Sequence, residues 1–197
     1  MDKKKSKMPL IIAAGVVWVL MIGTGLFILV RNFNKHVVVS EQDEKAVVGA
    51  FDLVPYFEGF SPSKVYETLN KSKWFDQSVE IEYEYDSPVE GEPYILLSIS
   101  QERTNSDASA SYMTQWTSFK LGFNASGESL QFKEAGSFVR VGDRSRFANV
   151  SAGEELIGQL LVAQKGLFIY TFYMTGFVIE DASIWGELFE GRFEALE

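Results

Sequence analysis

The stretch Pro9–Val30 constrains the chain more than any other feature of its sequence. Its 22 residues, PLIIAAGVVWVLMIGTGLFILV, contain no charged side chain. A helix of that length spans about 33 Å, which matches a hydrocarbon core of about 30 Å. Because lipid offers no partner for backbone groups, an inserted segment of this kind is helical. We therefore expect a transmembrane helix at 9–30.

The flanks of this helix predict its orientation. Residues 1–8 contain four lysines, whereas only Arg31 and Lys35 follow the helix closely. Positive residues favour the cytoplasmic side, so we expect residues 1–8 to form a cytoplasmic tail. Everything after about Arg31 is then expected on the periplasmic side. The alternative is a cleaved signal peptide, whose apolar region is shorter and is followed by a small-residue cleavage site. No such site follows here, which favours a retained single-pass anchor.

Charge and cysteine usage exclude several classes of function. From Val37 onward there are 12 Lys and Arg against 26 Asp and Glu, a formal charge of −14, whereas the whole chain carries −9. Such an acidic domain repels nucleic acid and anionic lipid. The chain has no cysteine and only His36 as a histidine, so thiol catalysis and most transition-metal sites lack their residues. A translocated domain without disulfides indicates a bacterial inner-membrane protein.

The first part of the exported region is expected to be a membrane-proximal connector at 31–50, followed by one α+β domain at 51–197. Ser40 followed by Asp43 resembles a capping box for a short helix in the connector. Pro62 after a serine, with apolar residues at helical spacing behind it, predicts a helix at 62–71.

The middle of the chain predicts two strands and a helix. Residues 79–86, VEIEYEYD, alternate strictly between apolar and acidic side chains, which is typical of a half-buried strand. Residues 94–100 are the expected partner strand. A helix capped by Ser106 or Asp107 and ending near Leu121, before Gly122, carries an aromatic stripe that we interpret as core.

The last third is expected to be mainly antiparallel sheet. Short strands are predicted at 129–133, 137–141 and 146–150, the last two joined by a turn at Gly142-Asp143. Residues 156–164 and 167–179 form a predicted hairpin through Lys165-Gly166. A second transmembrane segment is the alternative for this apolar run, but the polar residues inside it and its β-branched and aromatic content favour a buried strand. Asp181 is expected to cap a final helix whose apolar side reaches Phe193 and Leu196.

Three groups of residues are candidates for contacts with partners. The alternation at 79–86 places Glu80, Glu82, Glu84 and Asp86 on one face, which suits a cation, a basic partner or simple solvation. The second group is an arginine cluster at a predicted turn, which suits a phosphate, a lipid headgroup, an acidic partner or simple solvation of a hairpin tip. The third is a set of small or aromatic residues in the membrane helix, which suits packing on a neighbouring helix or on a membrane-embedded cofactor, or contact with lipid alone. The second group consists of Arg140, Arg144 and Arg146, and the third of Gly15, Trp18, Gly23 and Gly25.

The order of the elements after residue 76 resembles that of PsbP-like domains. The closest similarity is the run LLVAQKGLFIYTFYMTGF at 160–177 followed by an aromatic-rich helix. The resemblance implies an α/β/α sandwich. Members of that family include extracytoplasmic proteins and photosynthetic accessory subunits, and they mostly bind and stabilise partners. The resemblance therefore implies no catalytic residue.

These observations favour a non-catalytic accessory or assembly subunit of a larger bacterial membrane complex, respiratory or photosynthetic. Its expected partners are subunits of that complex and the lipid bilayer, with no nucleic acid, no metal and no cofactor. The alternative is a membrane-tethered periplasmic domain that binds a lipid or another small ligand. A hydrolase that uses paired carboxylates is the third hypothesis.

Overall fold

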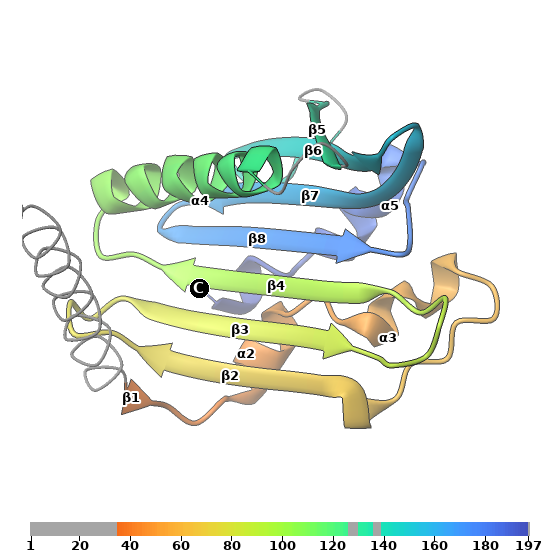
Figure 1. Ribbon diagram of the computed structural model, residues 1–197. Helices are drawn as coiled ribbons and strands as arrows, with labels where there is room; N and C mark the ends of the chain where they lie inside the picture. Colours follow the sequence, from red (N-terminus) through yellow and green to blue (C-terminus); the bar gives the residue numbers. More distant parts are fainter. Residues whose placement is uncertain (1–34, 126–129, 136–138, 197) are drawn as a thin grey trace, which may run out of the picture. The chain divides into compact units, whose positions relative to one another are not determined.

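The computed structural model describes residues 35–125, 130–135 and 139–196. The chain divides into two compact units, Met1–Lys35 and His36–Glu197. The membrane helix expected at 9–30 lies outside the described residues, and no helix within the described ranges is long and apolar enough to cross a membrane. The second unit is an α+β fold built on one sheet, as the sequence predicts (Figure 1).

The sheet has eight strands in the order β1-β2-β3-β4-β8-β7-β6-β5. Across the sheet, every pair of neighbouring strands in the series β2-β3-β4-β8-β7-β6-β5 is antiparallel. Pairing of β4 with β8 joins the first half of the sheet to the second. The strands are β1 Lys35–His36, β2 Glu67–Lys73, β3 Val79–Asp86, β4 Tyr94–Gln101, β5 Leu130–Glu134, β6 Arg144–Ala152, β7 Glu155–Lys165 and β8 Phe168–Thr175.

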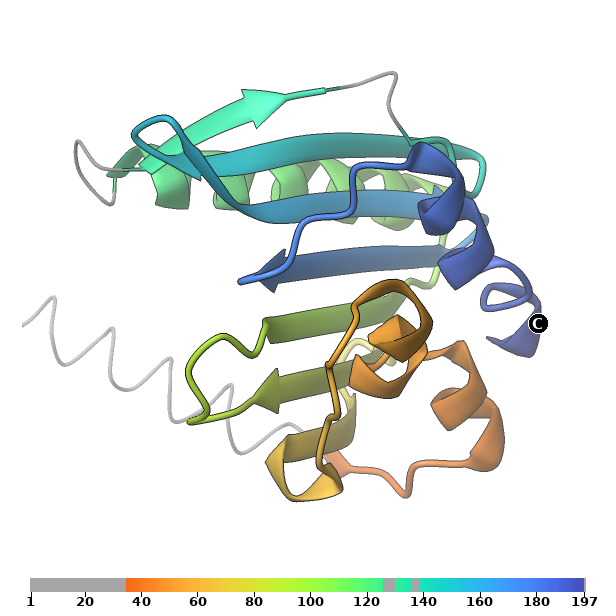
Figure 2. The ribbon, with the colours of Figure 1, turned by 90° about the vertical axis from the view of Figure 1, so that its right-hand side faces the viewer.

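Helices lie on both faces of the sheet. The long helix α4 lies over the half that contains β6 and β7, while α2, α3 and α5 lie together on the opposite face (Figures 1 and 2). The helices are α2 Glu41–Ala46, α3 Ala50–Leu53, α4 Asn105–Ala125 and α5 Ala182–Phe189, with 3-10 turns η1 Val54–Tyr56, η2 Lys64–Tyr66 and η3 Glu194–Leu196.

Each face of the sheet has its own apolar core. Under α4, Tyr112 and Trp116 pack on Leu160 and Val162 of β7. The larger core, on the opposite face, is closed by the aromatic side chains of α5 and by α2 and α3. Its largest fully buried members are Trp185, Tyr85, Tyr170, Phe147, Phe172, Leu53, Ile95, Leu97, Ile99 and Leu161.

The alternating segment 79–86 is strand β3, as predicted. Ile81, Tyr83 and Tyr85 are buried and face the larger core, opposite residues of β4 that are also buried. Because side chains alternate along a strand, the glutamates between them point to the other face, the one that carries α4.

The predicted hairpin at 156–179 is confirmed as β7 and β8, which excludes a second membrane helix in this run. Leu160, Leu161, Val162 and Ala163 are all 0% exposed, so β7 is covered on both faces. Gly166, with a φ of +56°, supplies the turn.

Two predicted helix caps are confirmed. Ser40 and Asp43 form a full capping box at α2, in which Asp43 N donates to Ser40 Oγ at 3.3 Å and Ser40 N donates to Asp43 Oδ2 at 2.7 Å. Asp181 caps α5 by accepting from Ser183 N at 2.9 Å. The last helix is shorter than expected, because Gly191 at a φ of +71° turns the chain away after Phe189.

Helix α4 exceeds its predicted bounds at both ends. Thr104 caps it by accepting from Asp107 N at 3.1 Å, so the helix begins before Ser106. Gly122 does not end it. A Cβ added at Gly122 meets nothing within 4 Å, so this glycine lies on an open side of the helix.

The predicted helix at 62–71 is wrong. Only the short turn η2 follows Pro62, and Glu67–Lys73 forms strand β2 against β3. Val65, counted in the expected apolar stripe, is 84% exposed. Burial alternates between half-buried and exposed from Glu67 to Lys71, and pairing along β3 outweighs the weak local helix signal.

The predicted strand at 137–141 is not formed by its described part, and residues 136–138 are outside the described ranges. Val139 and Val141 are buried without strand pairing because the Ser145 hydroxyl occupies their backbone groups: it donates to Val139 O and accepts from Val141 N. Gly142 turns the chain as predicted, with a φ of +67°.

The expected connector at 31–50 contributes to the larger core from Ser40 onward. Ala46, Val48 and Ala50 are 0% exposed and pack with residues of β3 and β4. The Tyr83 hydroxyl accepts from Ala50 N at 2.7 Å and donates to Glu67 Oε1 at 2.7 Å, which fixes α3 to the sheet.

Candidate functional site

The arginine cluster expected at 140–146 does not converge on one point. Arg144 lies 4.2 Å above the ring of Tyr112 and donates to Gln164 Oε1 at 2.7 Å and to Ser109 Oγ at 2.8 Å. Arg146 lies 5.5 Å from the ring of Trp116. Both guanidinium groups therefore fasten α4 to β6 and β7.

Arg140 is separate from the other two arginines. It is exposed and lines an open hollow beside α5, together with Gly186 and Glu190. The membrane-helix candidates Gly15, Trp18, Gly23 and Gly25 lie outside the described residues.

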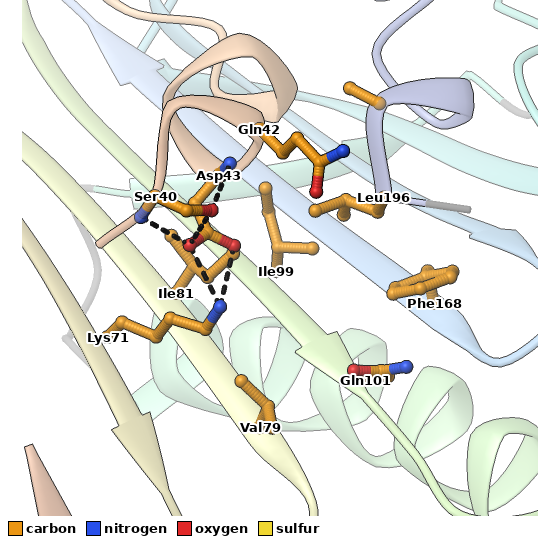
Figure 3. A pocket seen from close by; sticks show the side chains of 11 residues that line it. Ser40, Gln42, Asp43, Lys71, Val79, Ile81, Ile99, Gln101, Phe168 and Leu196 are labelled. Atoms are coloured by element: carbon orange, nitrogen blue, oxygen red, sulfur yellow. Dashed lines mark hydrogen bonds and ion pairs between the residues drawn. The ribbon is translucent and has the colours of Figure 1, made fainter. Parts of the chain in front are cut away.

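A small slot opens between α2, the sheet and the final turn η3 (Figure 3). Its volume is about 150 Å³. Ser40, Asp43 and Lys71 form one polar end, and Gln42 and Gln101 add polar groups among the apolar side chains of the other walls. The remaining lining residues are Val79, Ile81, Ile99, Phe168, Ala195 and Leu196.

A buried ion pair closes the polar end of the slot. Lys71 Nζ lies 2.8 Å from both carboxylate oxygens of Asp43, and Asp43 is 3% exposed. Burial by itself raises the pKa of Asp43, but hydrogen bonds from Lys71 and Ser40 outweigh it, so the pKa lies below the ordinary value of 3.8. Sequence analysis identified Ser40 and Asp43 as a cap, but the partner Lys71 lies 28 positions away, in the segment predicted to be helical.

The Asp43 pair is expected to make stability depend on pH. A carboxyl whose pKa is lowered by folding stabilises the fold above its unfolded pKa, and that contribution is lost as the pH falls through the folded value. We expect Asp43→Asn to reduce the free energy of unfolding by about 1–3 kcal/mol at pH 7. The difference from wild type should shrink below about pH 4.

Urea unfolding at pH 7 and at pH 3 measures this dependence. The matched control is Glu41→Gln, because Glu41 is an exposed carboxylate on the same helix. A difference between wild type and Asp43→Asn that is equal at both pH values would contradict the assigned role of the pair.

The half of the sheet face beside α4 carries a polar surface over β2, β3 and β4, here called the acidic face. It consists of the side chains that point away from the larger core: Thr68, Asn70, Ser72, Glu80, Glu82, Glu84, Asp86, Tyr94, Leu96, Ser98 and Ser100. In the register, Glu82 lies between Asn70 and Ser98, so a row of carboxylates is flanked by hydroxyl and amide groups.

Neutral donors hold two of these carboxylates. Glu80 accepts from Trp74 Nε1 at 3.1 Å and from the Ser98 hydroxyl at 3.1 Å, and Glu84 accepts from the Tyr94 hydroxyl at 2.9 Å. The pKa of Glu82 is raised above its ordinary value. The main cause is partial desolvation on the sheet surface, and repulsion from Glu80 and Glu84 adds to it.

Within the described ranges, no group of three or more His, Cys, Asp or Glu residues is arranged to hold a metal ion. No family model matches the chain, and comparisons with curated proteins and with solved structures find no match.

Proposed function

We propose that the chain is a non-catalytic accessory or assembly subunit of a larger bacterial membrane complex, respiratory or photosynthetic. In this proposal the segment 9–30 anchors it in the inner membrane with the N-terminus in the cytoplasm. The unit that begins at His36 lies on the periplasmic side and contacts the complex.

The observation that carries this proposal is the acidic face. A sheet normally has both of its faces covered or one face solvated, and here one face is covered over half of its strands only (Figure 1). The uncovered half presents a broad array of hydrogen-bonding groups around Glu82. A surface of this kind suits a protein interface better than an enclosed reaction site.

The proposal predicts that the membrane helix packs on a neighbouring subunit. Packing and close approach drive helix association in lipid, so large residues at small positions interfere. We expect Gly15→Leu, Gly23→Leu and Trp18→Ala to insert normally but to reduce co-purification of the complex. The measurement is recovery from the native membrane in mild detergent, compared with a chain that carries an unrelated polyleucine helix. If the wild-type chain and the polyleucine chain are recovered with the complex equally well, residues 9–30 serve only as a membrane anchor.

The slot beside Asp43 favours a second candidate function, a tethered domain that binds a lipid or another small ligand. A small concave site in which several polar groups converge beside apolar side chains is typical of small-molecule sites. Its volume of about 150 Å³ admits only a small group or one end of a larger molecule.

A further inference from the structure

Half of one sheet face has no described element over it. Helix α4 packs mainly on β5, β7 and β8, with side-chain contacts to β6 and to the Ser100 end of β4, so it leaves β2, β3 and most of β4 open on its side (Figure 1). Thr68, Asn70 and Glu82 are exposed there, and Glu80 and Glu84 are half-buried. The open strip is three strands wide, about 10–14 Å, which matches the width of one polypeptide element laid beside α4.

The boundary between α4 and this strip is lined by polar side chains near the start of the helix and by the rings of Phe119 and Tyr173 farther along. Ser111 donates to Glu102 Oε1 at 2.6 Å, and Gln115 Nε2 donates to the Ser100 hydroxyl at 3.1 Å. At helical spacing the same side of α4 continues to Gly122, where an added Cβ would meet nothing within 4 Å. The flank of α4 therefore leaves room for a neighbour.

The charge on this strip is not balanced within the described part of the chain. The described residues form four ion pairs, and none of them includes a glutamate of the acidic face. These pairs are Lys71–Asp43, Lys120–Glu134, Lys165–Glu194 and Arg192–Asp52. Trp74, Tyr94 and Ser98 donate hydrogen bonds to the carboxylates of Glu80 and Glu84 but carry no charge. Successive carboxylates lie about 6.6–6.8 Å apart along β3, within the range of mutual repulsion.

We propose that the acidic face binds a lysine- and arginine-rich segment of a neighbouring subunit in the membrane complex. This inference rests on the proposed function and names the chemistry of its partner. A basic segment places opposite charges against Glu80, Glu82 and Glu84 and finds hydrogen-bond partners in the flanking Asn70 and Ser98.

Charge also argues against the other occupants of this face. A second copy of the chain brings a unit of formal charge −14 from Val37 onward, which repels an acidic surface. Anionic lipid headgroups are repelled for the same reason. Complementary charge across an interface guides association and selects partners, and it is weakened by salt because the Debye length is only about 8 Å at physiological ionic strength.

The first test removes the charges and keeps the shape. In the full chain, Glu80→Gln, Glu82→Gln and Glu84→Gln are combined, since glutamine still accepts hydrogen bonds from Trp74 and Tyr94. The matched control combines Glu58→Gln, Glu154→Gln and Glu155→Gln, three exposed carboxylates elsewhere that give the same change in net charge.

We expect the acidic-face variant to lose about tenfold in co-purification with the complex in mild detergent, while the control stays at the wild-type level. Thermal midpoints of both variants should match wild type within a few degrees, which shows that each variant folds. Recovery of the wild type should fall as salt is raised, and recovery of the acidic-face variant should change less.

The second test identifies the contact directly. A water-soluble carbodiimide joins a carboxylate to a lysine amine in contact with it, through an amide bond. In the purified complex we expect Glu82 or Glu84 joined to a lysine of another subunit. If the chain is recovered with the complex, yet the acidic-face variant is recovered equally well and the links form elsewhere, this inference fails and the proposed function stands. If the chain is recovered without any complex, both fail.

Discussion

Replacing Trp185 with alanine is expected to reduce the free energy of unfolding by about 3–5 kcal/mol, the largest effect of any single substitution considered for this chain. Trp185 is 0% exposed in the larger core. Its ring packs edge-on against Phe147 and Phe172, with centroid distances of 5.3 and 5.5 Å, and lies near Phe189. Truncation leaves a large cavity where α5 meets the sheet.

Trp185→Phe is the matched control. In the described structure the indole Nε1 of Trp185 is buried without a hydrogen-bond partner. Phenylalanine keeps much of the apolar contact and removes that unsatisfied donor, so its cost is expected to be below about 2 kcal/mol. Urea unfolding followed by circular dichroism measures both variants. An alanine variant within about 1 kcal/mol of wild type would contradict the assigned role of Trp185 in the core.

A chain that begins at Phe51 is expected not to fold, whereas one that begins at His36 should unfold cooperatively. The shorter chain lacks the Asp43–Lys71 ion pair and the hydrogen bond from Arg192 Nη1 to Lys45 O at 2.9 Å. It also lacks four core residues, each no more than 6% exposed: Ala46, Val47, Val48 and Ala50.

Circular dichroism during heating distinguishes the two chains. The loss of several fully buried side chains is expected to exceed the total stability of a domain of this size, which is about 5–15 kcal/mol. The chain from His36 serves as the control for removal of the membrane segment. Equal thermal midpoints for the two chains would show that α2 and the residues after it are dispensable.

Sequence reasoning succeeded where one local pattern determines the structure. The strict alternation at 79–86 and the apolar run around Gly166 predict β3 and the β7–β8 hairpin, because side-chain period and turn chemistry agree there. The caps at Ser40 and Asp181 were found for the same reason, since a cap is specified within four residues.

Sequence reasoning failed where a distant partner decides the structure. Residues 67–73 pair with β3, and that pairing outweighs the local signal after Pro62. Ser145 replaces strand pairing at Val139 and Val141, which no periodicity indicates. The slot was missed for a related reason: its ends come from α2, β2 and η3, and only the folded chain brings them together.

The acidic face was only half predictable. The glutamates of β3 were assigned to one side of a strand, but the strand order that leaves them uncovered beside α4 depends on β4 pairing with β8. Whether a row of charges is a solvated surface or an interface depends on what covers it, and that is a property of the assembled fold.

The mass of the native particle tests the central proposal most directly. The full chain is extracted from its own membrane in mild detergent, and the particle is measured by native mass spectrometry. The proposal predicts one stable assembly that contains this chain together with the subunits of a larger membrane complex. A particle with the mass of this chain alone would contradict it, and a small molecule bound to that lone chain would favour the ligand-binding alternative instead.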